Sequence, residues 1–151
     1  MKNGVQSSFS LATVAGLSKF ESSVVSKPDG KTLHRQFVQL GNHRRRLTNE
    51  LLVLLPDIYE SGIFKKYERT IEEYAGRFGG LSGSVVQKRL RLEKYVYDKP
   101  ELRDAIRTEG VHKVALVASL ATKENAWTLA DKLKNMSKPA VQELSKELRG
   151  G

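Results

Sequence analysis

Residues 70–97 decide the fold, and they read TIEEYAGRFGGLSGSVVQKRLRLEKYVY. Thr70 is a residue type preferred at helix N-caps, and Glu72 and Glu73 place negative charge where the helix dipole favours it. Behind this cap, apolar side chains recur at helical spacing at Ile71, Tyr74, Ala75 and Phe78. We therefore predict a short helix that ends at Gly79-Gly80, because glycine readily adopts the left-handed conformation of a helix end.

A second helix is predicted directly after this turn, with Ser82 as its N-cap. Its apolar side chains recur at Val85, Val86, Leu90, Val96 and Tyr97. A short helix with a small residue, a tight glycine turn and an anchored second helix are the parts of a helix-turn-helix. Gly80 makes the predicted turn one residue longer than the commonest version. Ordinary helical hairpins show the same pattern, so they remain an alternative.

The residues that precede this stretch predict one long helix. Apolar side chains alternate at intervals of three and four, with Arg44 in the one interrupted position, at Leu33, Phe37, Leu40, Leu47, Leu51 and Leu54. This amphipathic helix should end near Pro56, or continue after a kink until Gly62. Residues 1–30 are rich in Ser, Gly and Val, and we expect them to form a flexible arm before a helical domain at 31–149.

Four more helices are predicted after the central stretch, at residues 101–108, 111–120, 122–133 and 137–149. The run from 111 to 120 is almost wholly apolar and should be the buried central helix. No alternating strand pattern of useful length occurs in the sequence. The predicted fold class is all-α, a helix-turn-helix embedded in a compact bundle of about six to seven helices.

Composition limits the partners that the chain can have. Among 151 residues, 26 Lys and Arg against 17 Asp and Glu give a net charge of +9, which attracts polyanions such as nucleic acid. The absence of cysteine excludes disulfides, thiolate metal sites and cysteine nucleophiles. No apolar stretch is long enough for a membrane helix. We expect a cytoplasmic, nucleoid-associated protein with no membrane partner.

The second helix of the central stretch carries the predicted site. Its polar side gathers residues that can contact phosphates or base edges, namely Ser82, Ser84, Gln87, Lys88, Arg91 and Lys94. Arg89 falls between the polar and apolar faces, where it can pair with Glu73 or with a phosphate. A second basic cluster, Arg44, Arg45 and Arg46, is expected to contact the flanking DNA backbone. Ordinary solvated basic faces are the alternative for both clusters.

Short stretches of sequence also resemble known DNA-binding regions. They are IEEYAGRFGGLSGSVVQKRLRL at 71–92, PELRDAI at 100–106, VALVA at 114–118 and SKPAVQEL at 137–144. Over residues 47–148 the chain resembles the helical region that precedes the nuclease module of bacterial HNH endonucleases, and more loosely the central domain of ParB-type partition proteins. The resemblance implies DNA binding by residues 82–94, most directly through Ser84, Gln87, Lys88 and Arg91. The nuclease module and the nucleotide-binding box of those families have no counterpart in this sequence.

The sequence shows no catalytic constellation. None of the three histidines, His34, His43 and His112, has a carboxylate at zinc-site spacing, and the glycine-rich turn lacks the spacing of a phosphate loop. We therefore expect no enzyme, no cofactor and no bound metal. The expected function is duplex-DNA binding by a transcription regulator, a partition or nucleoid factor, or the detached DNA-binding part of a mobile-element nuclease.

Three alternatives stay open. The chain could be an adaptor that binds protein through the apolar side of the 33–54 helix, and that same side could pair two copies of the chain as a homodimer or pack within its own bundle. Tyr95, Tyr97 and Trp127 could stack on the bases of single strands, although Trp127 lies at a spacing more typical of a core residue.

Overall fold

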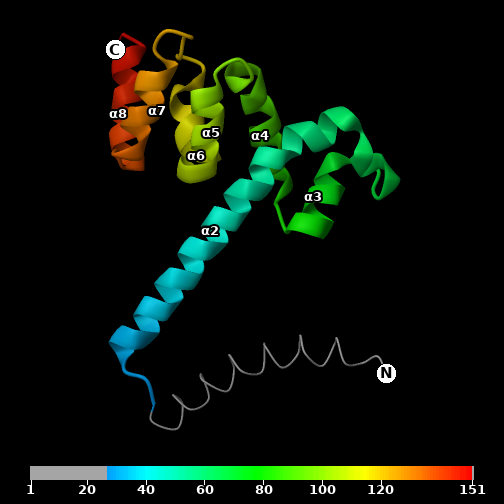
Figure 1. Cartoon of the computed structure of the whole chain (residues 1–151), viewed down its shortest axis with the longest axis vertical. Coiled ribbons are helices and arrows are strands. Elements are labelled where there is room, and N and C mark those ends of the chain that lie inside the picture. Colours follow the sequence, from blue (N-terminus) through cyan, green and yellow to red (C-terminus); the bar gives the residue numbers. More distant parts are fainter. Residues whose placement is uncertain (1–26, 151) are drawn as a thin grey trace. The chain divides into compact units, whose positions relative to one another are not determined.

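The computed structural model describes residues 27–150. Within this range the chain forms seven α-helices and one 3-10 helix, and no strand (Figure 1). The all-α fold class predicted from the sequence is therefore confirmed. The chain divides into two units between Asn42 and His43, which are described separately below. The predicted N-terminal arm lies outside the described residues except for its last four, 27–30.

The described part of the first unit is residues 27–42, and most of it is the beginning of α2 (Gly30–Ser61). Asp29 starts the helix, because its Oδ1 accepts a hydrogen bond from the backbone N–H of Thr32 at 2.8 Å. Hydrogen bonds from Thr32 lower the pKa of Asp29 below its ordinary value. Three apolar side chains of this segment, Leu33, Phe37 and Leu40, are exposed.

In the second unit, α2 continues through Pro56 to Ser61 and Gly62 follows it, so of the two outcomes that the sequence left open the helix does not end at the proline but continues to Gly62. Proline has no N–H, so within a helix it leaves the carbonyl four residues earlier without its usual partner. That carbonyl belongs to Leu52, and it accepts a hydrogen bond from Arg89 Nε at 2.9 Å. Leu52, Leu55 and Pro56 are buried on the same side of the helix. Burial of this side and the donor from Arg89 together explain why the helix tolerates its proline.

After α2, Gly62 takes a left-handed conformation (φ 73°), and the 3-10 helix η1 (Ile63–Lys66) buries Phe64. The next two helices, α3 (Ile71–Gly79) and α4 (Gly83–Val96), pack against each other. Both predicted N-caps are confirmed, since Thr70 accepts from the Glu73 N–H and Ser82 accepts from the Val85 N–H.

The turn between α3 and α4 consists of three residues, Gly80, Leu81 and Ser82, because Gly79 belongs to α3. The expected longer turn was therefore wrong. Gly80 is left-handed (φ 67°), its N–H donates to Gly76 O, and the Leu81 N–H donates to Ala75 O. The bond from Gly80 is that of the αL helix-end motif, and both bonds satisfy carbonyls that a helix end leaves without partners.

Four shorter helices complete the second unit: α5 (Pro100–Glu109), α6 (Val111–Ala118), α7 (Ala126–Lys134) and α8 (Lys138–Leu148). α5 packs on α7, while α6 packs on both α4 and α8 (Figure 1). As predicted, α6 is central, with Val111, Val114, Val117 and Ala118 buried. Asn49 and Glu50 tie α2 to α5, because the Asn49 amide donates to Arg107 O and Glu50 forms an ion pair with the Arg107 side chain.

Several expectations about burial were wrong. Phe78, predicted in the core, is 53 % exposed and packs with Tyr67 and Tyr74 in a surface aromatic cluster. Tyr97 and Trp127 are exposed at 68 % and 65 %. Likewise, all six apolar side chains of the predicted α2 stripe are exposed; the least exposed of them, Leu51 at 37 %, lies near Gly79 of α3.

One helix begins later than predicted. α7 starts at Ala126 rather than at residue 122. Thr122 and Asn125 form reciprocal hydrogen bonds, since the Asn125 N–H donates to Thr122 Oγ1 at 3.1 Å and the Thr122 N–H donates to Asn125 Oδ1 at 2.6 Å. Such local side-chain bonds compete with a helical backbone and hold these residues in a turn. None of the helices between residues 27 and 150 is both long and apolar enough to cross a membrane.

Candidate nucleic-acid interface

Helix α4 separates a buried face from a polar face. Val86, Arg89, Leu92 and Val96 are buried, and they recur at intervals of three and four. The polar face carries the residues that the sequence singled out. Of these, Ser82, Ser84, Arg91 and Lys94 are exposed, whereas Gln87 and Lys88 are half-buried. The structure therefore brings the six predicted α4 residues to the outer side of one anchored helix.

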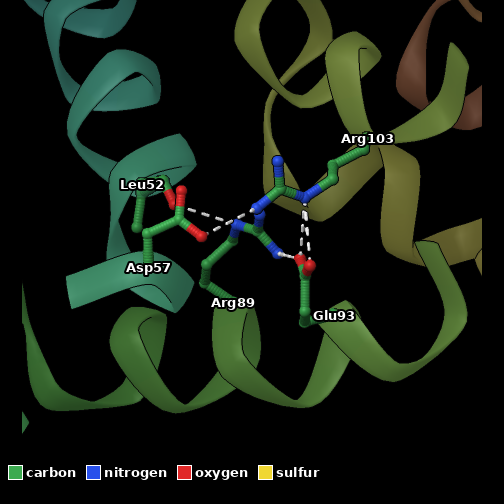
Figure 2. A network of polar contacts seen from close by, with 5 residues as sticks. All are labelled: Leu52, Asp57, Arg89, Glu93 and Arg103. Carbon is green, nitrogen blue, oxygen red and sulfur yellow. Dashed lines mark hydrogen bonds and ion pairs between the residues drawn. The ribbon is translucent and has the colours of Figure 1, made fainter. Parts of the chain in front are cut away.

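Arg89 anchors α4 from the buried face of the helix. The prediction that Arg89 pairs with Glu73 or with a phosphate was therefore wrong. Its side chain is 0 % exposed, and Figure 2 shows it directed between α2 and α5. Nε donates to Leu52 O, and Nη1 forms an ion pair with Glu93 Oε1 at 2.9 Å. Burial lowers the pKa of Arg89 below its ordinary value, and Glu93 opposes that shift.

The same network reaches the neighbouring helices (Figure 2). Arg103 of α5 donates from Nε to Glu93 Oε2 at 3.0 Å, and its Nη2 lies 3.8 Å from Asp57 Oδ1 on α2. Three helices therefore meet at one set of charges. Because a buried charge without a partner is very costly, this set fixes where α4 can lie relative to α2 and α5.

The N-terminal end of the polar face is held by α3. Gln87 Nε2 donates a hydrogen bond to Glu72 Oε2, and Ser82 and Ser84 join their hydroxyl groups at 3.2 Å. Glu72 places a negative charge beside the first turn of α4. An incoming phosphate would be repelled there, so anion binding is more favourable further along α4, towards Arg91 and Lys94.

A groove of about 410 Å³ runs along this face, between the start of α3 and α4. Its polar lining includes Arg69, Glu72, Gln87 and Arg91. Arg69 is exposed and joins Arg91 on the groove, although sequence analysis did not select it. Its position directly before the Thr70 cap was the available signal, because residues that flank a helix start lie close to the neighbouring helix of a tight pair.

On its other side, α4 faces α6. Lys88 Nζ lies 3.0 Å from His112 Nδ1, across the contact between the two helices. Partial burial, then the charges of Lys88 and of Lys138, lower the pKa of His112 below its ordinary value. His112 is the second residue of α6. Nothing in the sequence connected it with Lys88 or Lys138.

The second predicted cluster lies in the part of α2 that belongs to the second unit. Arg44, Arg45 and Arg46 are all exposed on successive positions of the helix. Successive helix residues point in different directions, so the three guanidinium groups spread around α2. No three His, Asp or Glu side chains in the described range come together as a metal-ligand set.

Comparison with family models, with curated proteins and with solved structures finds no match. The resemblance to the HNH-associated and ParB-type regions therefore stays a prediction from the sequence. What can be argued about function rests on the geometry of α3, α4 and their neighbours.

Proposed function

We propose that the protein binds duplex DNA by placing the polar face of α4 in the major groove. The observation that carries this proposal is the arrangement of α4 itself. One face is buried and fixed by the Arg89 network, while the opposite face exposes Ser84, Arg91 and Lys94. A rigid helix with an exposed, basic outer face, preceded by a short helix and a three-residue turn, has the form that helix-turn-helix proteins use.

Different residues of the polar face of α4 would contact bases and phosphates. Arg91 can donate two parallel hydrogen bonds to a guanine edge, and Lys94 and Arg69 can neutralise phosphates beside it. Gln87 can read adenine only if its amide leaves Glu72 or uses its second N–H, because Nε2 already donates to that carboxylate. Arg91 is therefore the strongest candidate for base recognition, and Gln87 a conditional one.

Arg44, Arg45 and Arg46 would add contacts that do not depend on sequence. Arginines on an exposed helix contact backbone phosphates with little geometric demand, and each contact releases counterions. With no catalytic group in the proposed interface, we propose a DNA-binding factor without enzymatic activity and without a cofactor. A regulator, a partition or nucleoid factor and the detached DNA-binding part of a nuclease all fit this role.

The test is the affinity of the full chain for labelled duplex DNA, measured by fluorescence anisotropy. Arg91→Gln should weaken binding to the preferred sequence by about 1–3 kcal/mol, because a bidentate base contact is lost. Lys132→Gln is a matched control, since Lys132 is an equally exposed cation in the last turn of α7. The proposal fails if Arg91→Gln, folded as judged by circular dichroism, binds every duplex as tightly as the control does.

The exposed stripe of α2 supports a second candidate function, association with another helix. Its six apolar side chains are exposed and, apart from the position that Arg44 occupies, repeat at intervals of three and four, which is the pattern of a coiled-coil seam. A second copy of this chain is the partner we propose, because the seam presents leucine at each alternate position, 33, 40, 47 and 54. Dimerisation would also serve DNA binding, since dimers engage two half-sites.

A further inference from the structure

The ring of His112 contacts one lysine, Lys88, and is affected by the charge of a second lysine, Lys138. Lys88 belongs to α4, His112 to α6 and Lys138 to α8, and α6 packs on both other helices. Lys88 Nζ lies 3.0 Å from His112 Nδ1. The His112 ring and Lys138 are exposed, and Lys88 is half-buried, so all three can be reached from solvent.

The protonation state of His112 follows from this contact. An ammonium group can only donate, so Nδ1 of His112 must accept the hydrogen bond from Lys88 and carry no proton. Partial burial, followed by the charges of Lys88 and Lys138, lowers the pKa of the ring. Besides burial, the charges that lower the pKa of the ring are those of Lys88 and Lys138. Among the described residues, neither lysine takes part in an ion pair with a carboxylate.

We propose that Lys88, His112 and Lys138 form a binding site for one phosphate group of the DNA backbone, beside the groove that α4 enters. The inference rests on the proposed function, and it adds a site that extends the interface from α4 to α6 and α8. A phosphate would supply the missing negative charge and accept hydrogen bonds from all three side chains. Because Nδ1 accepts from Lys88, the neutral ring already carries its one donor at Nε2, and the negative charge of a phosphate would favour a second proton on Nδ1.

Proton uptake by His112 would make the affinity for DNA depend on pH, which attraction between fixed charges alone does not. Phosphate favours the protonated ring, so the pKa of His112 must be higher in the complex than in the free protein. By linkage, affinity for DNA rises as the pH falls through the window between these two pKa values. His112→Gln should remove this part of the pH dependence while leaving binding at pH 8 nearly unchanged, because the neutral ring contributes no charge there.

The direct test follows the ring of His112 by NMR, with its signal assigned by comparison with His112→Gln. In the free protein the pKa should lie below the ordinary value for histidine, and Lys88→Gln should raise it. Adding duplex DNA should raise it as well. If anisotropy shows that the duplex binds but the pKa of His112 does not move, the phosphate site is wrong and the proposed DNA-binding function stands.

Two further arms separate the remaining outcomes. Lys138→Gln should flatten the slope of log affinity against log salt by about 0.9, the value for one phosphate contact. Lys146→Gln, an exposed lysine further along α8, should leave that slope unchanged. If no duplex binds but inorganic phosphate raises the pKa of His112, the anion site stands and the proposed function fails. If neither ligand shifts the pKa, the site is rejected.

Discussion

At the scale of single residues, Arg89 supplies the hydrogen-bond donor that Pro56 removes from α2. Pro56 leaves the carbonyl of Leu52 without a helical donor, and Arg89 brings a buried charge that needs partners. The hydrogen bond from Arg89 Nε gives Leu52 O a donor, and the ion pair to Glu93 gives the guanidinium an opposite charge, while Nη2 is buried without a hydrogen-bond partner. This explains how a proline can lie inside α2 and an arginine inside the core.

We expect Arg89→Ala to lower the free energy of unfolding by about 3–5 kcal/mol, because it breaks a buried ion pair and leaves a void. Arg89→Met should cost less, since methionine fills the space and Glu93 keeps its bond to Arg103. What Arg89→Met still loses is the donor to Leu52 O, which costs about 1–3 kcal/mol.

Urea unfolding of a double-mutant cycle measures that bond. Pro56→Ala restores an N–H that can donate to Leu52 O, so Arg89→Met should cost less in the Pro56→Ala background than in the wild type. Equal costs in the two backgrounds would show that the proline and the arginine are not coupled.

At the scale of helices, the sequence predicted well those features that depend on residues close together in the chain, such as helix caps. The caps at Thr70 and Ser82 were predicted from the sequence and are confirmed, because a capping side chain bonds to its own first turn. Burial was predicted less well. Arg89 occupies a core position that its charge disguises, and the contacts with Leu52 of α2 and Glu93 of α4 make that position tolerable. The approach of His112 to Lys88 likewise depends on packing between helices, because these two residues are 24 positions apart in the sequence.

The stripe of α2 is the element whose role can be tested separately. We expect the chain to form dimers in sedimentation equilibrium, and Leu40→Glu to make it monomeric, because it replaces a leucine by a charge in a seam that Arg44 already interrupts. Lys31→Glu is the control, since Lys31 is exposed on the same helix and lies off the apolar spacing. A wild-type chain that stays monomeric at all concentrations would contradict this second candidate function.

At the scale of the whole molecule, the positions of the cations matter more for attracting DNA than the net charge of +9 does. Many cations are paired with carboxylates, such as Arg77 with Glu68 and Lys113 with Glu109. Those cations contribute little to a field that attracts DNA. We expect the exposed residues of α4 and of the Arg44–Arg46 segment to attract DNA. Only α4 is expected to determine which DNA sequence is preferred.

Changing Arg44, Arg45 and Arg46 together to Gln should therefore weaken binding to all duplexes about equally. The slope of log affinity against log salt should become flatter by up to about 3 units, with no change in the preferred sequence. A triple variant that keeps its slope but loses self-association would instead place this cluster at a protein interface.

The central claim, that this chain is a duplex-DNA-binding protein, is tested most directly by the salt dependence of the unmodified chain. We predict a straight, steep decline of log affinity with log salt, with a slope of about −0.9 for each phosphate contacted, and a slope that flattens when Arg91 and Lys94 are changed to Gln. No measurable affinity for duplex DNA at low salt, or a slope near zero, would contradict it.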